Sequence, residues 1–310
     1  MSLTLRNYGS EDDYWRIRAF LREVFLLNAH KERSWQAARL DYWRWHILKN
    51  CLEIDSVEDF IYIWEDRKGR IAGVLNPENL GEAFLQVHPE YSGSYSLLEE
   101  MVGCAEKHLN ISCDAERKKL YIWLCHDDNL CRLILRKKGY SMTQYSEYQR
   151  IRYLHNDIEA AEVPANFSIR SLGDHDELPG RSWASWRAFH PGEPDEKYDG
   201  WEWYRNIQNM PLYRRDLDLV ALTNKDSIAA FCTIWYDDAT RTGYFEPVGT
   251  VPEFQRKGLA RALLLEGMKR LFKMGAITAT VSGASMPANS LYSSIFSGDY
   301  SIMECWQKNF

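Results

Sequence analysis

The hydrophobic and polar positions of the first half follow a regular order of strands and helices. Alternation predicts a short strand over residues 3–8, and Trp- and Arg-rich helical sequence follows over 11–50. After these come three strands, a helix, a strand, a helix and a last strand, over 60–64, 70–75, 83–88, 96–109, 120–125, 129–140 and 146–153.

The second half repeats this order. Its elements are a strand, Trp-rich helical sequence, three strands, a helix, a strand, a helix and a closing strand, over 167–172, 178–208, 217–222, 227–236, 243–251, 259–274, 277–281, 289 onward and 300–307. Two local echoes accompany it: Pro89-Glu90-Tyr91 recurs as Pro252-Glu253-Phe254, and the segment 129–140 matches 289–300 without a gap.

The repeat predicts two α/β (α+β) domains in tandem. The first covers residues 1–155, a polar, proline-containing linker covers 156–166, and the second domain covers 167–310. The alternative is one continuous mixed α/β domain.

Composition narrows the class of protein. The 310 residues are 45% hydrophobic and 26% charged, as in globular proteins, and suffice for two cores. The net charge of −6 and the lack of a basic tract argue against a nucleic-acid partner. No signal peptide or membrane-spanning stretch is recognisable. Seven scattered cysteines without a C-x-x-C pair are expected to be reduced, in a cytoplasmic protein without a metal site.

One segment of the second half has the pattern of a phosphate-binding turn. The strand 243–251 ends before Pro252, and a short basic loop leads through Gly258 into the helix. A helix N-terminus offers unpaired N–H groups and partial positive charge, and glycine lets a phosphate approach. Nearby Arg256, Lys257 and Arg261 add cations in an otherwise acidic protein.

The run from Gln255 to Ala260 (QRKGLA) resembles the Q/R-x-x-G-x-G/A signature of the GNAT superfamily of acyl-CoA-dependent N-acyltransferases. Downstream, Asn289-Ser290-Leu291-Tyr292 resembles the family's N-x-x-A/L-Y segment. The resemblance covers about 167–310; in the first half it depends on element order alone. Gly298-Asp299-Tyr300 departs from the family's usual G-F.

The resemblance implies two tandem GNAT-like domains, each a mixed, mostly antiparallel sheet flanked by helices. It implies an acetyl-CoA-dependent N-acetyltransferase that acts in its C-terminal domain without a metal. The acetyl group would pass to a primary amine of a small molecule by direct attack in a ternary complex. The resemblance is also compatible with a homodimer. The residues implied to bind the cosubstrate are Val248, Thr250, Gln255, Arg256, Lys257, Gly258, Leu259, Ala260, Arg261 and Asn289.

Two residues are candidates for the chemistry of acyl transfer. The hydroxyl of Tyr292 would face the thioester sulfur and donate a proton to the leaving thiolate. Glu246 precedes Thr250 by four positions, so strand alternation predicts both on one face, where Glu246 could accept the amine proton. The plainer alternatives are a packing tyrosine and a salt-bridged carboxylate. His190 and water are the other candidate bases.

The acceptor cannot be identified from the residues. An aromatic group (Trp183, Trp186, Trp201, Trp203 and Tyr204) and three nearby acids (Asp195, Glu196 and Asp199) would suit a small cationic amine. Core packing explains the aromatic residues equally well.

The first half lacks the corresponding chemistry. Ser92 to Leu97, in register with the basic loop, contain no cation, while Arg132 and Ala83 stand in register with Tyr292 and Glu246. The run 126–128 (HDD) lacks metal-ligand spacing and is interpreted as a loop and helix cap. This half is therefore expected to be a degenerate GNAT-like domain.

Two other functions remain open. A non-catalytic acyl-CoA-binding sensor would keep the fold and the loop but would not need an acid and a base. An aminoacyl transferase to peptidoglycan or protein would need a surface for RNA, which the acidic charge disfavours.

Overall fold

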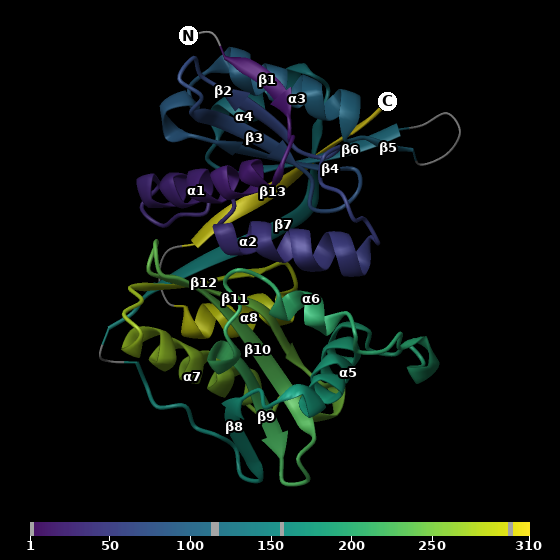
Figure 1. The fold of residues 1–310 in the computed structure, drawn as a ribbon, viewed down its shortest axis with the longest axis vertical. Coiled ribbons are helices and arrows are strands. Elements are labelled where there is room, and N and C mark those ends of the chain that lie inside the picture. The colour runs from purple at the N-terminus through teal and green to yellow at the C-terminus, as the bar shows by residue number, and fades with distance from the viewer. Residues whose placement is uncertain (1–2, 113–117, 156–157, 297–299) are drawn as a thin grey trace. The chain divides into compact units, whose positions relative to one another are not determined.

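A computed structural model describes residues 3–112, 118–155, 158–296 and 300–310 (Figure 1). The chain divides into two compact units. Unit 1 comprises Met1–Gln149 and Tyr300–Phe310, and unit 2 comprises Arg150–Asp299. No helix within the described residues combines the length and apolar character needed to cross a bilayer.

Unit 1 is built on one mixed sheet with the strand order β1-β2-β3-β4-β6-β13-β7. All its neighbouring pairs with a resolved register are antiparallel except β4 with β6, which is parallel. The strands are β1 (Thr4–Asn7), β2 (Tyr62–Glu65), β3 (Ile71–Asn76), β4 (Glu82–Val87), β5 (Ile111–Ser112), β6 (Lys118–Cys125), β7 (Ser141–Tyr153) and β13 (Tyr300–Asn309). The helices are α1 (Glu11–Leu27), α2 (Ala37–Tyr42), the π-helical η1 (Trp43–Cys51), the 3-10 turn η2 (Pro89–Tyr91), α3 (Tyr95–His108) and α4 (Asn129–Lys137).

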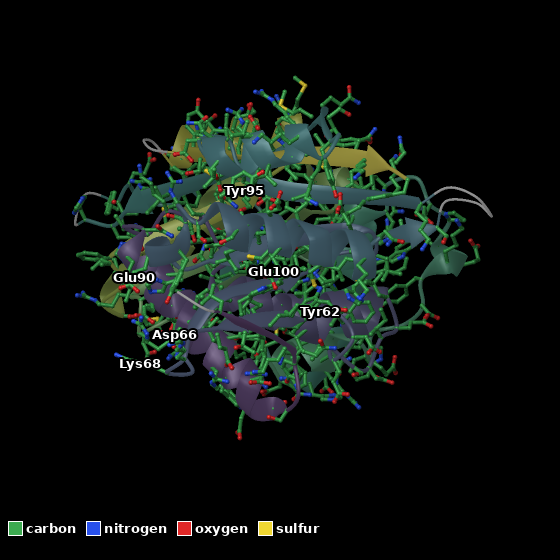
Figure 2. The ribbon with its side chains drawn as sticks, turned by 90° about the horizontal axis from the view of Figure 1, so that it is seen from above. Tyr62, Asp66, Lys68, Glu90, Tyr95 and Glu100 are labelled. Carbon is green, nitrogen blue, oxygen red and sulfur yellow. The ribbon has the colours of Figure 1, made fainter. Side chains whose placement is uncertain are left out.

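Strand alternation gives unit 1 two cores, one on each face of the sheet. Tyr62 and Trp64 belong to the core that includes α3 and α4, whereas Ile61 and Ile63 belong to the core that includes α1 and α2. The predicted turn between β2 and β3 is present, and Figure 2 labels Asp66 and Lys68 on it. The Asp66 carboxylate accepts hydrogen bonds from the amides of Lys68 and Arg70.

The C-terminal strand lies in the sheet of unit 1, which differs from the sequence-based boundary of 167–310. Strand β13 pairs antiparallel with β6 from Met303↔Cys125 to Asn309↔Lys119. Its Trp306 is buried in the core beneath α3 and α4, and its Glu304 forms an ion pair with Arg132 of α4. The last strand of the second repeat therefore belongs to unit 1, because its backbone pairs with a strand that lies far away in the sequence.

Unit 2 repeats the architecture with the strand order β8-β9-β10-β11-β12. The first three pairs are antiparallel, and β11 with β12 is parallel. The strands are β8 (Phe167–Ser171), β9 (Asp218–Thr223), β10 (Ile228–Asp237), β11 (Thr242–Thr250) and β12 (Thr278–Gly283). The helices are α5 (Leu178–Phe189), α6 (Tyr204–Gln208), α7 (Leu259–Lys273) and α8 (Met286–Ile295), with 3-10 turns η3 (His175–Glu177), η4 (Asp195–Lys197), η5 (Arg215–Leu217) and η6 (Pro252–Phe254).

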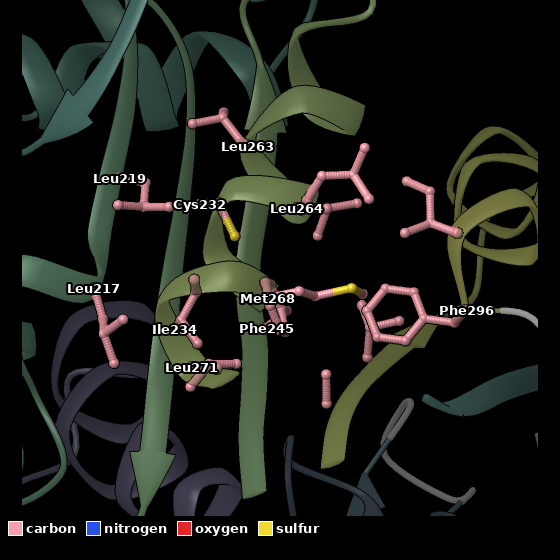
Figure 3. Packing of buried hydrophobic residues seen from close by; sticks show 14 of the residues in the cluster. Leu217, Leu219, Cys232, Ile234, Phe245, Leu263, Leu264, Met268, Leu271 and Phe296 are labelled. Atoms are coloured by element: carbon pink, nitrogen blue, oxygen red, sulfur yellow. The ribbon is translucent and has the colours of Figure 1, made fainter. Parts of the chain in front are cut away.

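Helix α7 packs its apolar side onto the sheet of unit 2 (Figure 3). Leu263, Leu264, Met268 and Leu271 are at most 2% exposed and share one cluster with Ile234 of β10 and Phe245 of β11. Close contact depends on glycine: a Cβ on Gly267 would lie 2.3 Å from Ile234, and one on Gly243 would lie 2.2 Å from Leu271. This packing fixes the N-terminus of α7 beside the end of β11.

The predicted fold class is confirmed, since each unit is a mixed, mostly antiparallel sheet flanked by helices. Helix α8 begins earlier than predicted, at Met286 instead of Asn289, because Ser285 caps its N-terminus and proline is accepted in a first helical turn. Of the predicted linker 156–166, the structure describes 158–166.

Candidate functional site

Two neighbouring strands of unit 2 separate beyond the middle of the sheet. Strand β11 pairs with the parallel β12 only from Thr242↔Thr278 to Tyr244↔Thr280. Both strands continue, β11 to Thr250 and β12 to Gly283. The second half of β11 therefore has an edge that is not paired with β12.

Backbone groups of Val248 and Thr250 face this open edge. The Val251 amide donates to Ala229 of β10, and Gly249 stands opposite Phe231. Because hydrogen-bonded and non-hydrogen-bonded pairs alternate in an antiparallel ladder, Val248 and Thr250 direct their N–H and C=O groups away from β10. The side chain of Gln255 already donates to the Thr250 carbonyl, at 3.3 Å. The open edge can thus pair with an extended amide-bearing ligand.

The turn that follows β11 presents a row of unused backbone donors. Within the described residues, the amides from Arg256 to Arg261 donate no hydrogen bond to the protein, and the first amide of the helix to do so is Ala262. Arg256 and Gly258 have positive φ angles of 62° and 84°. Successive N–H groups in such a turn form a concave anion site, which the N-terminus of α7 reinforces. Gly258 is the N-cap and adds no side chain.

The three cations of this turn are placed differently. Arg256 and Lys257 are exposed, and the Lys257 ammonium lies 5.1 Å from the Phe254 ring centroid. Arg261 instead donates to Glu159 at 2.7 Å and forms an ion pair with it. The charge of Arg261 is therefore partly committed to a contact inside unit 2.

The side-chain amide of Asn289 uses its NH2 group in a hydrogen bond but not its oxygen. Its Nδ2 donates to the Gly283 carbonyl at 3.0 Å, while its Oδ1 is buried and has no hydrogen-bond partner within the described residues. The hydroxyl of Ser282, a residue that the sequence analysis missed, is likewise buried and unpartnered there. Such atoms are costly unless a ligand or water satisfies them. They fit an amide-bearing arm such as pantetheine, lying beside the open edge.

Tyr292 lies on the same helix as Asn289 and is 6% exposed. Burial, and secondarily the charge of Glu246, raise the pKa of its hydroxyl well above the ordinary value. The ring contacts Phe296, and a Cβ on Gly283 would lie 3.1 Å from it. The raised pKa favours the protonated hydroxyl, which is able to donate a hydrogen bond.

Glu246 lies at a β-bulge. Cys232 pairs with Val248 and Ile234 pairs with Phe245, so that Glu246 and Pro247 both stand opposite Thr233. Proline cannot donate to a ladder, so Pro247 was the sequence signal for this interruption. The bulge breaks the alternation from which Glu246 and Thr250 were expected on one face. The charge of Glu246 nevertheless contributes to the raised pKa of the Tyr292 hydroxyl.

The other candidates have structural contacts. His190 caps the end of α5, where its Nδ1 lies 3.0 Å from the Trp186 carbonyl oxygen. Tyr204 is fully buried and donates to Asp218, so for this residue core packing is the correct interpretation. Trp183 and Trp186 stack on each other and remain partly exposed.

The remaining members of the aromatic and acidic group lie in or near the loop between α5 and α6. Trp203 donates to the Gly200 carbonyl, and Trp201 packs against Arg205. Asp195, Glu196 and Asp199 are exposed, and Asp195 forms an ion pair with Arg187.

Unit 1 has the same strand separation but a closed turn. Strand β4 pairs with β6 only from Glu82↔Tyr121 to Phe84↔Trp123. Its helix α3 is capped by Ser94, whose hydroxyl accepts from the Leu97 amide. The amides of Ser92 and Ser94 are also used within the protein. A side chain thus occupies the position that Gly258 leaves open in unit 2.

The sequence analysis interpreted residues 126–128 as a loop and helix cap and not as a metal site. Asp128 is the N-cap of α4 and accepts from the Cys131 amide at 2.9 Å, as the sequence predicted. Cys125, His126 and Asp127 bring three ligand atoms within 4.8 Å of one another, but Asp127 forms an ion pair with Arg33.

The geometry of unit 2 can now be compared with known proteins. The sequence profile of the Acetyltransferase (GNAT) family matches residues 181–296. Residues 181–296 thus resemble a GNAT acetyltransferase domain. The matched segment runs from α5 to the end of α8 and includes every element of the site. The departure from the GNAT pattern noted above falls partly on Gly298 and Asp299, which lie outside the described residues.

Solved GNAT structures resemble the whole chain. A GCN5-related N-acetyltransferase from Sphaerobacter thermophilus has a TM-score of 0.69 at 16% identity, covering 99% of this chain and 95% of its own. A tandem GNAT protein from the clavulanic acid biosynthesis pathway has a TM-score of 0.65 at 12% identity. The match covers 99% of this chain and 98% of that protein. A GNAT-family acetyltransferase from Colwellia psychrerythraea has a TM-score of 0.60 at 12% sequence identity. The match covers 98% of this chain and 100% of that protein. A search of curated proteins found no match. At these identities the likeness concerns the fold, which is that of a tandem GNAT protein.

Proposed function

We propose that the protein is an acetyl-CoA-dependent N-acetyltransferase that acetylates a primary amine of a small molecule in unit 2. The observation that carries the proposal is the row of six unused amides, from Arg256 to Arg261, at the end of an open strand edge. The row of amides suits phosphate groups, and the open strand edge suits the amide-bearing pantetheine arm. Asn289 and Ser282 would satisfy their buried oxygens on that arm.

Each residue then has a distinct task. An edge amide of β11 near Thr250 would stabilise the charge that develops on the acyl oxygen. Glu246 would take the proton from the attacking amine, directly or through water. Tyr292 would donate a hydrogen bond to the departing sulfur; its raised pKa favours donation over complete proton transfer. The acyl group passes directly to the amine as the C–S bond breaks, and the sulfur leaves as a thiolate that accepts a hydrogen bond from Tyr292. The thiolate takes up a proton from solvent, and Glu246 returns the amine proton to solvent.

The closed turn of unit 1 leads to a first prediction. Acetyl-CoA should bind the intact chain with a stoichiometry of one, because Ser94 fills the helix N-terminus of unit 1 and no cation lies in the run 92–97. Titration calorimetry measures this number. A stoichiometry near two would contradict the assignment of the donor site to unit 2 alone.

The second prediction concerns Glu246. If its carboxylate removes the amine proton, Glu246→Gln should depress kcat/KM near neutral pH, because the amide cannot accept a proton. The loss should shrink as the pH approaches the pKa of the amine itself, about 10.4 for a lysine-like amine, since free base is then abundant. The measurement is kcat/KM from pH 6 to 10.

Glu266→Gln is the matched control, because Glu266 is a helix α7 carboxylate paired with Arg270. Its profile should overlay that of the wild type. A Glu246→Gln profile that merely parallels the wild type would remove Glu246 from the mechanism and leave His190 or water as the base.

A further inference from the structure

Unit 1 contains a cavity of about 290 Å³ where β4 and β6 separate. Leu85 and Val87 of β4 and Trp123 and Leu124 of β6 form its apolar walls. A second, inner pocket of about 10 Å³ shares four lining residues with it, Arg33, Ser34, Leu85 and Trp123. That volume holds one group of the size of a water molecule. The cavity thus has an apolar wall formed by β4 and β6, and its remaining lining includes the polar residues Asn28, Ser92 and Asp128.

Two side-chain oxygens of the pocket lining, in Glu32 and Gln149, make no hydrogen bond in the described part of the chain, although the Glu32 oxygen lies 3.5 Å from Nη1 of Arg39. The indole N–H groups of Trp35 and Trp123, also on the lining, are likewise without a hydrogen bond within the described residues. Glu32 and Gln149 are each 6% exposed, and the Oε1 atom of each is buried and makes no hydrogen bond within the described residues. The other oxygen of Glu32 accepts from Gln36 at 2.8 Å. Two buried acceptors on the lining of one water-sized space can be satisfied by a small group that donates several hydrogen bonds.

The charge around this pocket favours a cation. Arg39 is the buried guanidinium nearest to Glu32, at 3.5 Å, and it also forms ion pairs with Glu78 and Glu147. Three carboxylates therefore surround one guanidinium. Arg33 is the cation that the pocket lining itself contains, and it forms an ion pair with Asp127. The cluster carries an excess of negative charge, which a bound ammonium would neutralise.

We propose that this cavity binds a small primary ammonium compound with an apolar body. The ammonium group enters the inner pocket and donates to Glu32 and Gln149, and the apolar body lies against Leu85, Val87 and Trp123. The ligand is distinct from the cosubstrate of unit 2, since the closed turn at Ser94 offers no site for phosphates.

The proposal implies a pH dependence. Burial raises the pKa of Glu32 to about 7, Arg39 lowers it and Glu147 raises it, with Glu78 and Arg33 as the other charges nearby. Ammonium binding requires the ionised carboxylate, so affinity should fall as the pH drops below about 7 and Glu32 becomes protonated.

The test uses the full chain and three probes of one shape: phenethylammonium, 2-phenylethanol and 3-phenylpropionate. Phenethylammonium should slow amide hydrogen exchange in the segments 32–35 and 84–86, and the neutral and anionic probes should bind at least about tenfold more weakly. Exchange reports each segment separately, so binding at an amine site in unit 2 cannot imitate the result. If the three probes protect these segments equally, or none does so, the proposal is wrong.

Variants provide the second arm. Glu32→Gln should remove the protection and its pH dependence, and Gln149→Leu should weaken it. Glu100→Gln, an exposed carboxylate on α3 (Figure 2), is the matched control and should bind as the wild type does. Undiminished protection in a folded Glu32→Gln chain would overturn the proposal. If that variant does not fold, the three-probe comparison on the wild type decides.

Discussion

Gly258→Glu should abolish acetyl-CoA binding. Gly258 is the N-cap of α7, within a row of amides that have no protein partner, and its φ angle is 84°. A glutamate there would bring a negative charge and a bulky side chain to the position where a phosphate would approach. Calorimetry with acetyl-CoA should detect no binding at concentrations that saturate the wild type.

Gly275→Glu separates this effect from backbone strain. Gly275 follows the other end of the same helix, has a φ angle of 91°, and has nothing within 4 Å of an added Cβ. Both substitutions force a side chain into the left-handed region, at a cost of about 1 kcal/mol or more. Gly275→Glu should therefore lower stability similarly and leave binding unchanged. Equal loss of binding in both variants would show that strain, and not the anion, is responsible.

Tyr292→Phe should lower kcat by roughly 10²-fold while the affinity for acetyl-CoA stays nearly unchanged. The substitution removes only a hydroxyl, and the ring keeps its packing against Phe296. Stopped-flow or steady-state measurement of thiol release gives kcat, and calorimetry gives the affinity.

Tyr236→Phe is a suitable control, because that hydroxyl donates to the Met274 carbonyl away from the open edge of β11. It should leave kcat within a factor of about two. If Tyr292→Phe behaves in the same way, the tyrosine is a packing residue and the sulfur leaves without its help.

The sequence predicted most of the fold because both of its periodic signals are local. Strand alternation and the helical pattern gave the repeated order of elements, and the glycine before α7 gave the phosphate-binding turn. The placement of β13 could not be predicted this way, because its pairing with β6 depends on residues far apart in the chain. Trp306, buried in unit 1, looks like any apolar strand residue in the sequence.

The candidate site was predicted less completely than the fold. The turn after β11 could be selected from its glycine and cations, and Asn289 and Tyr292 from their resemblance to a GNAT segment. The unpartnered oxygens of Asn289 and Ser282 depend on three-dimensional packing. The bulge at Glu246 and Pro247 was foreseeable from the proline alone, and it alters the face to which Glu246 belongs. The polar cluster around Glu32 joins residues from distant segments, so no local sequence pattern could predict it.

The most direct test of an N-acetyltransferase in unit 2 is incubation of the purified chain with acetyl-CoA and a panel of small primary amines. Free thiol and acetylated amine should be measured together. The account predicts that at least one amine raises thiol release well above the rate without amine, with an equal amount of acetylated product. It also predicts that Gly258→Glu abolishes both. Tight acetyl-CoA binding without transfer to any amine would contradict the account and would favour an acyl-CoA-binding sensor.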